Sequence, residues 1–220
     1  MMKQTKKTLN FLFLAVFAFL LSLTVSCTRT PPEITYGYLQ LVIYQGQDGP
    51  QEHFSLFVMI EDEDGIDNLD VLYLYHDREQ LRWKINSDEW IHHNNDNKDW
   101  IGTRSIAVAE GELPRGQYRV VLVNKGGEST ERSITYDGNV RFAFPEIEIS
   151  GGIYTVKSQW PVNRLVCYDS NGNYLSTIII NSLSGSVSGL GLPTGSRTAA
   201  LWAEDESNFC SAFTNVIPVN

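Results

Sequence analysis

Cysteine and histidine are scarce in this 220-residue sequence, which has three cysteines and four histidines. It contains no CxxC, no CxxCH and no cysteine–histidine spacing typical of a zinc site. The H-E-x-x-H, P-loop and dinucleotide-binding fingerprints are also absent, and the nearest approach to G-x-S-x-G, at residues 185–189, has valine at its centre. These absences argue against an enzyme, and we expect neither catalytic residues nor a cofactor.

Positive charge is scarce as well. The chain has 17 Lys and Arg against 26 Asp and Glu, a formal net charge of −9. Residues 1–26 hold three lysines and no acid, so the remainder has 14 basic against 26 acidic residues, a net charge of −12. Such a surface repels phosphate backbones, and we expect no nucleic-acid partner. It favours solubility and could also attract cations or basic partners.

An uncharged, mostly apolar run occupies residues 9–25, between a basic head and Cys27. This is the three-part plan of a secretory signal. Its 17 residues are close to the roughly 20 that a membrane-spanning helix needs, so a retained helix and a plain secretory signal remain as alternatives. All three interpretations place the residues after 27 outside the cytoplasm.

Residues 23–27 (Leu-Thr-Val-Ser-Cys) resemble the lipobox of bacterial lipoproteins. Ser26 and Cys27 fit the pattern, whereas the usual leucine stands one place early, at Leu23. The resemblance implies cleavage before Cys27 and lipid on that cysteine, where each buried methylene contributes about 0.8 kcal/mol. We therefore expect a signal peptide over 1–26, a short tether over 27–34, and a lipoprotein anchored to the membrane.

After residue 35 the pattern is one of strands and turns, and no stretch keeps helical periodicity for three turns. A short helical turn is expected only near residues 96–100. Asn171 and Gly172 predict a hairpin with a type I′ turn. The first series of predicted strands is 36–44, 54–60, 69–76, 80–85, 104–108, 117–123 and 129–136. The second series is 146–150, 153–158, 164–168, 174–180, 186–189, 197–203 and 209–217.

Seven strands in about 100 residues are typical of an immunoglobulin-like sandwich. The two series also share a motif, because Leu-Pro-Arg-Gly at 113–116 recurs as Leu-Pro-Thr-Gly at 192–195. We interpret this as duplication of one unit. The sequence therefore predicts an all-β fold with two tandem β-sandwich domains, over 35–140 and 144–220.

Residues 113–129 resemble the E–F corner, strand F and F–G turn of fibronectin type III domains. The resemblance implies that Tyr118 forms a tyrosine corner and that Val120 and Leu122 point into the core. Two features depart from the family: residues 54–60 lack its early tryptophan, and Arg197 stands where the second unit's corner tyrosine would be. Domains of this immunoglobulin-like or fibronectin type III-like kind act as spacers, docking modules or adhesion modules.

The acidic run at residues 61–67 offers oxygen ligands, with Asp62, Asp64 and Asp67 as calcium candidates. It does not follow the EF-hand pattern, because its glycine comes too early and no closing glutamate follows at the right distance. A solvated Asp-Gly turn explains the run without a metal.

Trp90 and Trp100 bracket a polar segment that contains His92 and His93, and we expect a long loop there. Exposed indoles can stack on sugar rings or anchor a protein partner. Alternatively, both indoles cover the edge of the core. Adjacent histidines diverge on an extended backbone, so they are poorly placed to share a metal.

If Cys27 is acylated, Cys167 and Cys210 remain as a pair. Outside the cytoplasm a disulfide is permitted, and two buried free thiols are the alternative.

We expect a membrane-anchored lipoprotein on the periplasmic or cell-surface side, acting as a non-catalytic binding or structural module with a protein or glycan partner. One alternative is a carbohydrate- or host-surface-binding adhesin that uses both indoles on one exposed patch. Another is a hydrolase with accessory β-sandwich domains, which requires a pocket with convergent polar groups.

Overall fold

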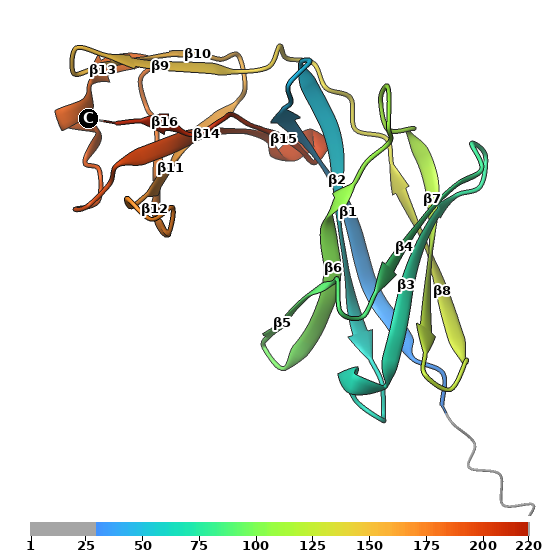
Figure 1. Ribbon diagram of the computed structural model, residues 1–220. Helices are drawn as coiled ribbons and strands as arrows, with labels where there is room; N and C mark the ends of the chain where they lie inside the picture. Colours follow the sequence, from blue (N-terminus) through green and yellow to red (C-terminus); the bar gives the residue numbers. More distant parts are fainter. Residues whose placement is uncertain (1–29, 220) are drawn as a thin grey trace, which may run out of the picture. The chain divides into compact units, whose positions relative to one another are not determined.

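The computed structural model describes residues 30–219, which are strand, turn and loop with no α-helix (Figure 1). Within this range the helical segments are three short 3₁₀ turns, at Ile66–Asn68, Val187–Leu190 and Glu206–Asn208. The predicted all-β class is therefore confirmed. The predicted signal peptide and Cys27 lie outside the described residues. None of the helical segments in the described range is long and apolar enough to cross a membrane.

The first half of the described chain contributes eight strands. Four of them form an antiparallel sheet in the order β4-β3-β7-β8, and the other four are neighbours in a larger sheet in the order β1-β2-β6-β5. Their bounds are β1 Glu33–Gln45, β2 Pro50–Glu61, β3 Leu69–His76, β4 Leu81–Asn86, β5 Ile91–Asn95, β6 Lys98–Ile106, β7 Gly116–Asn124 and β8 Ser129–Tyr136.

The second half contributes another eight strands. A three-stranded sheet has the order β13-β10-β9, while β12-β11-β14-β15 continues the larger sheet and β16 pairs with β14. The bounds are β9 Glu146–Ser150, β10 Ile153–Lys157, β11 Val162–Tyr168, β12 Tyr174–Ile179, β13 Ser184–Ser186, β14 Thr198–Asp205, β15 Cys210–Phe213 and β16 Ile217–Pro218.

The two halves share one nine-stranded sheet because β1 pairs with β15. This pairing is parallel and runs from Leu41 opposite Cys210 to Tyr44 opposite Phe213. The neighbouring pairs β1–β2 and β14–β15 are antiparallel. Strands that are far apart in the sequence therefore lie side by side at the middle of the sheet.

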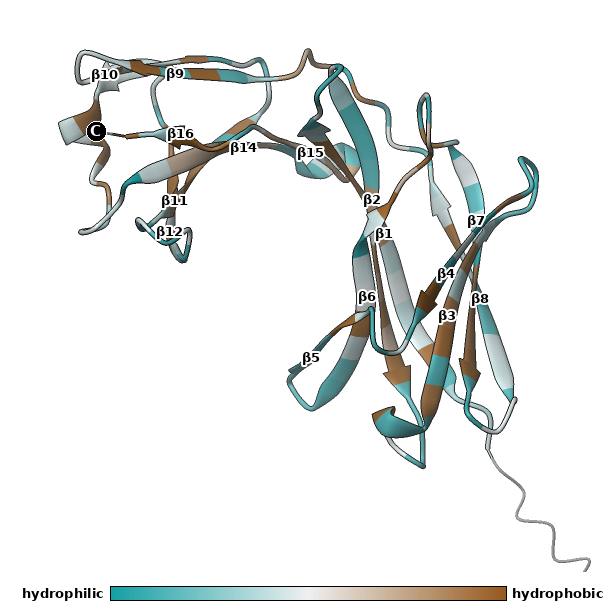
Figure 2. Ribbon diagram, in the orientation of Figure 1, coloured by the Kyte–Doolittle hydropathy of each residue, from teal (hydrophilic) through white to brown (hydrophobic). Residues whose placement is uncertain are grey.

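The first core lies between β1, β2 and β6 on one side and β3 and β7 on the other. Alternation along β7 places Tyr118, Val120 and Leu122 in this core, as expected from the period of two. Along β1, Leu41 and Ile43 point inward and Val42 points to the opposite face. Figure 2 shows hydrophobic colour along β3, which lies at the centre of the four-stranded sheet.

The second core lies between β10 on one side and β11 and β14 on the other, with Tyr154, Leu165 and Leu201 among its members. The connectivity resembles that of the first half. In each half the first two strands pair with each other and the second of them pairs with a later strand (β2 with β6, β10 with β13). Apart from β5, which extends the sheet beside β6, the remaining strands of each half lie in the facing sheet. The antiparallel sheets and their enclosed cores are consistent with immunoglobulin-like sandwiches.

Several local predictions need correction. The segment between Trp90 and Trp100 is not a loop with a helical turn but a hairpin of β5 and β6. Asp96 and Asn97 have φ of 51° and 59°, which is the left-handed pair that a type I′ turn requires. The predicted hairpin at Asn171 is formed by β11 and β12, but only Gly172 there has positive φ, so its turn is not type I′.

Three predicted strands also differ in extent. The strand expected at 186–189 is replaced by β13 and a 3₁₀ turn, and the one expected at 209–217 is divided into β15 and β16. The strand expected at 104–108 begins earlier, as β6.

Candidate binding face of the nine-stranded sheet

One face of the nine-stranded sheet packs on the two cores. The opposite face, called the outer face below, carries the side chains of the residues that alternate with the core residues along each strand. On β1 this outer face carries Tyr38, Gln40, Val42 and Tyr44, which are partly exposed while the residues between them are buried. On β14 it carries Trp202, between the buried Leu201 and Ala203. The outer face is therefore rich in aromatic side chains from both halves.

A hollow of about 540 Å³ lies on this face. Its floor is formed by Ser55, Val166 and Ser211, which are at most 7% exposed. Its remaining lining is aromatic or polar. The full lining is Gln40, Val42, Tyr44, Ser55, Arg104, Val166, Tyr168, Tyr174, Thr177, Trp202, Ser211 and Phe213.

The hollow lies across the β1–β15 pairing. Val42 is opposite Ser211 and Tyr44 is opposite Phe213 in the parallel register, while Trp202 is opposite Phe213 on the other side. The rings of Tyr44 and Phe213 have centroids 6.3 Å apart and are tilted by 58°. The hollow therefore depends on both halves of the chain.

Charge in the hollow is of one sign. Arg104 is the only charged residue of the lining, and it forms no ion pair with another residue in the described range. Burial raises the pKa of Tyr44, and the positive charge of Arg104 opposes that rise. The Tyr44 phenol is therefore neutral near pH 7 and can both donate and accept a hydrogen bond.

Trp202 is held in place by its cross-strand neighbour on β11, Arg164. The Arg164 guanidinium lies over its ring at 5.0 Å from the centroid. Arg164 is paired in turn with Glu204 and lies 3.6 Å from a carboxylate oxygen of Glu206. This stack fixes the plane of the indole without placing an acid in the lining of the hollow.

The four residues predicted as a binding loop separate onto two sides of the β5–β6 hairpin. Trp90 packs against the first core, whereas Trp100 does not belong to that core and stacks on His93 with their ring planes 1° apart. His92 hydrogen-bonds Asp99 at 2.9 Å. The prediction that both indoles share one patch is therefore wrong.

Trp100 belongs instead to a second aromatic group on the outer face. Its ring lies 6.0 Å from those of Tyr36 and Tyr38, and Phe57 stacks on Tyr38 at the same distance. Tyr36 is 48% exposed. The hairpin register explains this arrangement, because Trp100 pairs with Met59 and His93 along one row of the sheet.

Within residues 30–219 no group of three or more His, Cys, Asp or Glu side chains is placed so that it could hold a metal ion, and this includes the calcium candidates Asp62, Asp64 and Asp67. The Asp62 carboxylate instead accepts the backbone N–H of Asp64 at 2.8 Å. The Asp62 carbonyl accepts the N–H of Gly65, which closes the turn. The run is a solvated turn between β2 and the first 3₁₀ segment.

Cys167 and Cys210 are free thiols, so the predicted alternative of a disulfide is wrong. Cys167 pairs with Ala199 and Cys210 with Asp205, near the two ends of β14. Six strand positions at about 3.3 Å each put them roughly 20 Å apart. A disulfide needs Cα atoms within about 7 Å. Both thiols are buried, and burial raises the pKa of Cys210 to about 11.

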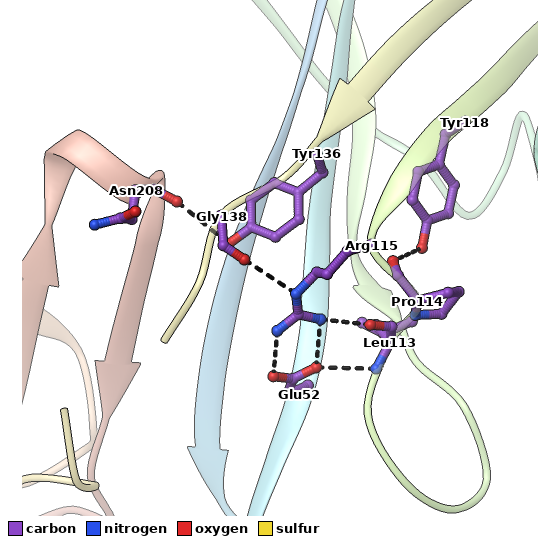
Figure 3. Close-up of polar contacts among 8 residues, drawn as sticks. All are labelled: Glu52, Leu113, Pro114, Arg115, Tyr118, Tyr136, Gly138 and Asn208. Carbon is purple, nitrogen blue, oxygen red and sulfur yellow. Dashed lines mark hydrogen bonds and ion pairs between the residues drawn. The ribbon is translucent and has the colours of Figure 1, made fainter. Parts of the chain in front are cut away.

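The predicted tyrosine corner is present at the base of β7. The Tyr118 hydroxyl donates to the Pro114 carbonyl at 2.6 Å (Figure 3). Arg115 beside it forms a two-pronged ion pair with Glu52 of β2, at 2.7 and 2.9 Å. The Leu113 N–H donates to the same carboxylate at 2.9 Å. These bonds fasten the corner to β2, which is the direct neighbour of β1.

Two further bonds link the corner to the end of β8, and the end of β8 to the segment before β15. The Arg115 Nε donates to the Gly138 carbonyl at 3.1 Å, and the Tyr136 hydroxyl donates to the Asn208 carbonyl at 3.3 Å (Figure 3). Cys210, the first residue of β15, belongs to the first core. The corner therefore supports the β1–β15 pairing across which the hollow lies.

Sequence reasoning did not find the hollow, because its lining comes from strands that are distant in the chain and pair only in the folded sheet. The sequence around Trp202 also gave no signal. Residues 199–203 (Ala-Ala-Leu-Trp-Ala) are apolar throughout, so they do not distinguish the outer face of β14 from the inner one.

No known protein family and no curated protein matches this sequence. Among solved structures, the chain is similar to Tp47, the 47-kilodalton lipoprotein of Treponema pallidum, with 16% identity and a TM-score of 0.44. The match covers 87% of this chain and 53% of Tp47, so the chain spans about half of that protein.

Two other solved structures are similar over comparable lengths of this chain. Dimeric latent PorU from Porphyromonas gingivalis has 11% identity and a TM-score of 0.33, covering 86% of this chain and 20% of PorU. Murine CEACAM1b has 9% identity and a TM-score of 0.26, covering 84% of this chain and 99% of that one. At these identities the similarity concerns the immunoglobulin-like β-sandwich fold alone.

Proposed function

We propose that the chain is an exported, lipid-anchored and non-catalytic binding module of the cell envelope. It consists of two tandem fibronectin type III-like sandwiches and binds its partner on the outer face of the nine-stranded sheet. The observation that carries this proposal is the hollow lined by Tyr44, Tyr168, Tyr174, Trp202 and Phe213. Aromatic side chains gathered in a concave surface with a few polar groups are typical of binding sites.

The composition of the hollow supports binding more than catalysis. Its lining contains no Asp, Glu, His or Cys, the side chains that most often serve as acid, base or nucleophile. The shared connectivity of the two halves and the tyrosine corner support the tandem fibronectin type III-like interpretation.

The distance from the proposed anchor suits display of this face. β1 begins at Glu33, a few residues after Cys27, and continues to Tyr44 in the hollow. Eleven steps along a strand at about 3.3 Å each carry the hollow roughly 36 Å from the first residue of β1. A lipid on Cys27 would hold one end of β1 near the membrane while the hollow remains accessible.

The binding face is tested by photo-crosslinking in intact cells. Benzoylphenylalanine replaces Tyr44 in one variant and Tyr73, which is partly exposed on the four-stranded sheet, in the matched control. We expect a cross-linked envelope component from position 44 and none from position 73. Equal or absent cross-linking at both positions would reject the face as the binding site.

The anchor is tested by labelling cells with a clickable fatty acid. The wild-type chain should incorporate the label and remain with the membrane fraction, and the Cys27→Ser variant should do neither. Label retained by Cys27→Ser would show that the lipobox interpretation is wrong.

A carbohydrate- or host-surface-binding adhesin remains the alternative, now through Trp100 with Tyr36 and Tyr38 rather than through both indoles. Trp100→Ala should abolish adhesion of the displayed chain to host-cell or glycan surfaces if this alternative holds. Trp90→Ala, whose indole packs on the first core, serves as the control.

A further inference from the structure

We propose that the hollow on the nine-stranded sheet binds an acidic saccharide, with a carboxylate of the sugar paired to Arg104 and sugar rings stacked on Trp202 and Tyr174. This inference rests on the proposed function, because it names the ligand of the same face. It follows from three properties of the lining: its aromatic surfaces, its hydroxyl and amide groups, and its charge.

The aromatic side chains offer an exposed ring at Tyr174 and two partly exposed rings, Trp202 and Tyr44, that their neighbours hold in place. Tyr174 is 62% exposed, and Trp202 is held by the Arg164 stack on one side. Tyr44 is fixed by ring contacts with His53 at 5.2 Å and with Phe213 at 6.3 Å. The C–H face of a sugar ring is apolar and flat enough to pack on such surfaces. Rings that are already fixed lose little conformational freedom when a ligand binds.

The polar groups of the lining suit hydroxyl-rich ligands. Gln40, Ser55, Thr177 and Ser211 supply amide and hydroxyl groups, and Tyr44 supplies a neutral phenol. These groups both donate and accept hydrogen bonds, as sugar hydroxyls do. The volume of about 540 Å³ lies within the range of about 300–1,000 Å³ usual for small-ligand sites.

The charge of the lining selects an anionic ligand. The chain has 26 acidic residues, yet none of them lines the hollow, and Arg104 is its single charge. No carboxylate in the described range pairs with Arg104, so its guanidinium is free to take one from a ligand, with two parallel hydrogen bonds.

A single-stranded nucleic acid would also offer rings and negative charge. However, proteins that bind single strands use a positively charged groove along the backbone, and here one arginine faces a chain with a net charge of −9. One carboxylate among otherwise neutral sugar rings matches the lining better than a run of phosphates.

The test measures binding of a panel of carboxylated saccharides to the full chain in detergent micelles, by calorimetry and tryptophan fluorescence. The probes are sialyllactose, trigalacturonate and a hyaluronan tetrasaccharide. Lactose and methyl-esterified trigalacturonate are the neutral counterparts, and an oligothymidylate and an acidic peptide represent the other classes. We expect at least one carboxylated saccharide to bind about tenfold or more tightly than its neutral counterpart.

Two variants and a matched control assign the contacts. Arg104→Gln should reduce the affinity for the carboxylated saccharide to that for the neutral one, without changing the latter. Tyr174→Ala, at an exposed position where folding is not at risk, should weaken both by roughly twofold to tenfold. Arg82→Gln removes an exposed arginine that lies over Tyr73 on the other sheet, and it should change nothing.

Failure of the inference is distinguishable from failure of the proposed function. If no carboxylated saccharide binds with a Kd below about 1 mM, or if Arg104→Gln and Arg82→Gln bind alike, the acidic-saccharide proposal is overturned. Tighter binding of the oligothymidylate or the peptide overturns it too. In each of these cases, a cross-link from position 44 but not from position 73 would still uphold the binding face itself.

Discussion

Replacing Tyr118 with phenylalanine removes one hydroxyl from the corner at the base of β7 while keeping the ring. The ring is fully buried and contacts Phe54 at 5.4 Å and His76 at 4.7 Å between centroids. These contacts survive in the variant, so the change isolates the 2.6 Å hydrogen bond to the Pro114 carbonyl. Leaving a buried acceptor unpaired costs about 1–3 kcal/mol.

Because Pro114 is only partly buried, water can replace part of the lost bond, and we expect a loss of about 1–2 kcal/mol in the free energy of unfolding. For a chain of this size, 1 kcal/mol shifts the melting temperature by about 2–4 °C, so the variant should melt roughly 2–8 °C lower. Tyr118→Ala, which also removes the ring, should lose about 3–5 kcal/mol.

The assay is urea unfolding followed by tryptophan fluorescence, with the slope of unfolding free energy against urea compared between variants. Tyr174→Phe is the control, because that side chain is 62% exposed and its change should stay within about 0.5 kcal/mol. If Tyr118→Phe were as stable as Tyr174→Phe, the hydroxyl would not hold the corner and the reasoning would be refuted.

Three further predictions concern other parts of the chain. Gly102→Ala should lower the free energy of unfolding by more than about 2 kcal/mol, because the added Cβ would lie 2.0 Å from a main-chain oxygen of β2. Gly127→Ala, in open space at φ 88°, should lower it by only about 1 kcal/mol, and equal melting temperatures of the two variants would contradict this. Cys167 and Cys210 should resist iodoacetamide at pH 8 in the folded chain and react fully in urea, because burial raises the pKa of both thiols. An adduct on either cysteine of the folded chain, detected by mass spectrometry, would contradict this. Hydrogen bonds from the side chains of Ser207 and Asn208 hold the pKa of Asp205 below the usual value, so the ionised carboxylate stabilises the fold fully above about pH 3.9 and this stabilisation is lost as the pH falls through the folded-state pKa. The difference in unfolding free energy between wild type and Asp205→Asn should therefore shrink on acidification, and a difference independent of pH would contradict this.

Features that depend on near neighbours in the sequence could be predicted from it. The strands β3 and β8 have the predicted bounds, because both show clear alternation between turn residues. The Tyr118 corner was predictable because its partner lies four residues away. The β5 strand was missed, since all its side chains are exposed and all but Ile91 are polar, which leaves no hydrophobic alternation to detect.

The binding face could not be predicted in the same way. The pairing of β1 with β15 joins Leu41 to Cys210, and no local pattern specifies which distant strand meets an exposed strand edge. The choice between a disulfide and two free thiols at Cys167 and Cys210 could not be made from the sequence for the same reason. Their distance depends on their positions along β14, which pairs with both of their strands.

The pairing of β15 with β1 has a consequence for synthesis. The paired residues Leu41 and Cys210 are 169 positions apart (210 − 41), so this contact closes late, after contacts between near neighbours. A chain arrested before residue 210 can still pair β1 with β2 and β3 with β7, but it lacks Ser211 and Phe213 of the hollow. Ligand binding on this face would therefore distinguish chains that extend through Phe213 from shorter ones in which β1 and β2 are already paired.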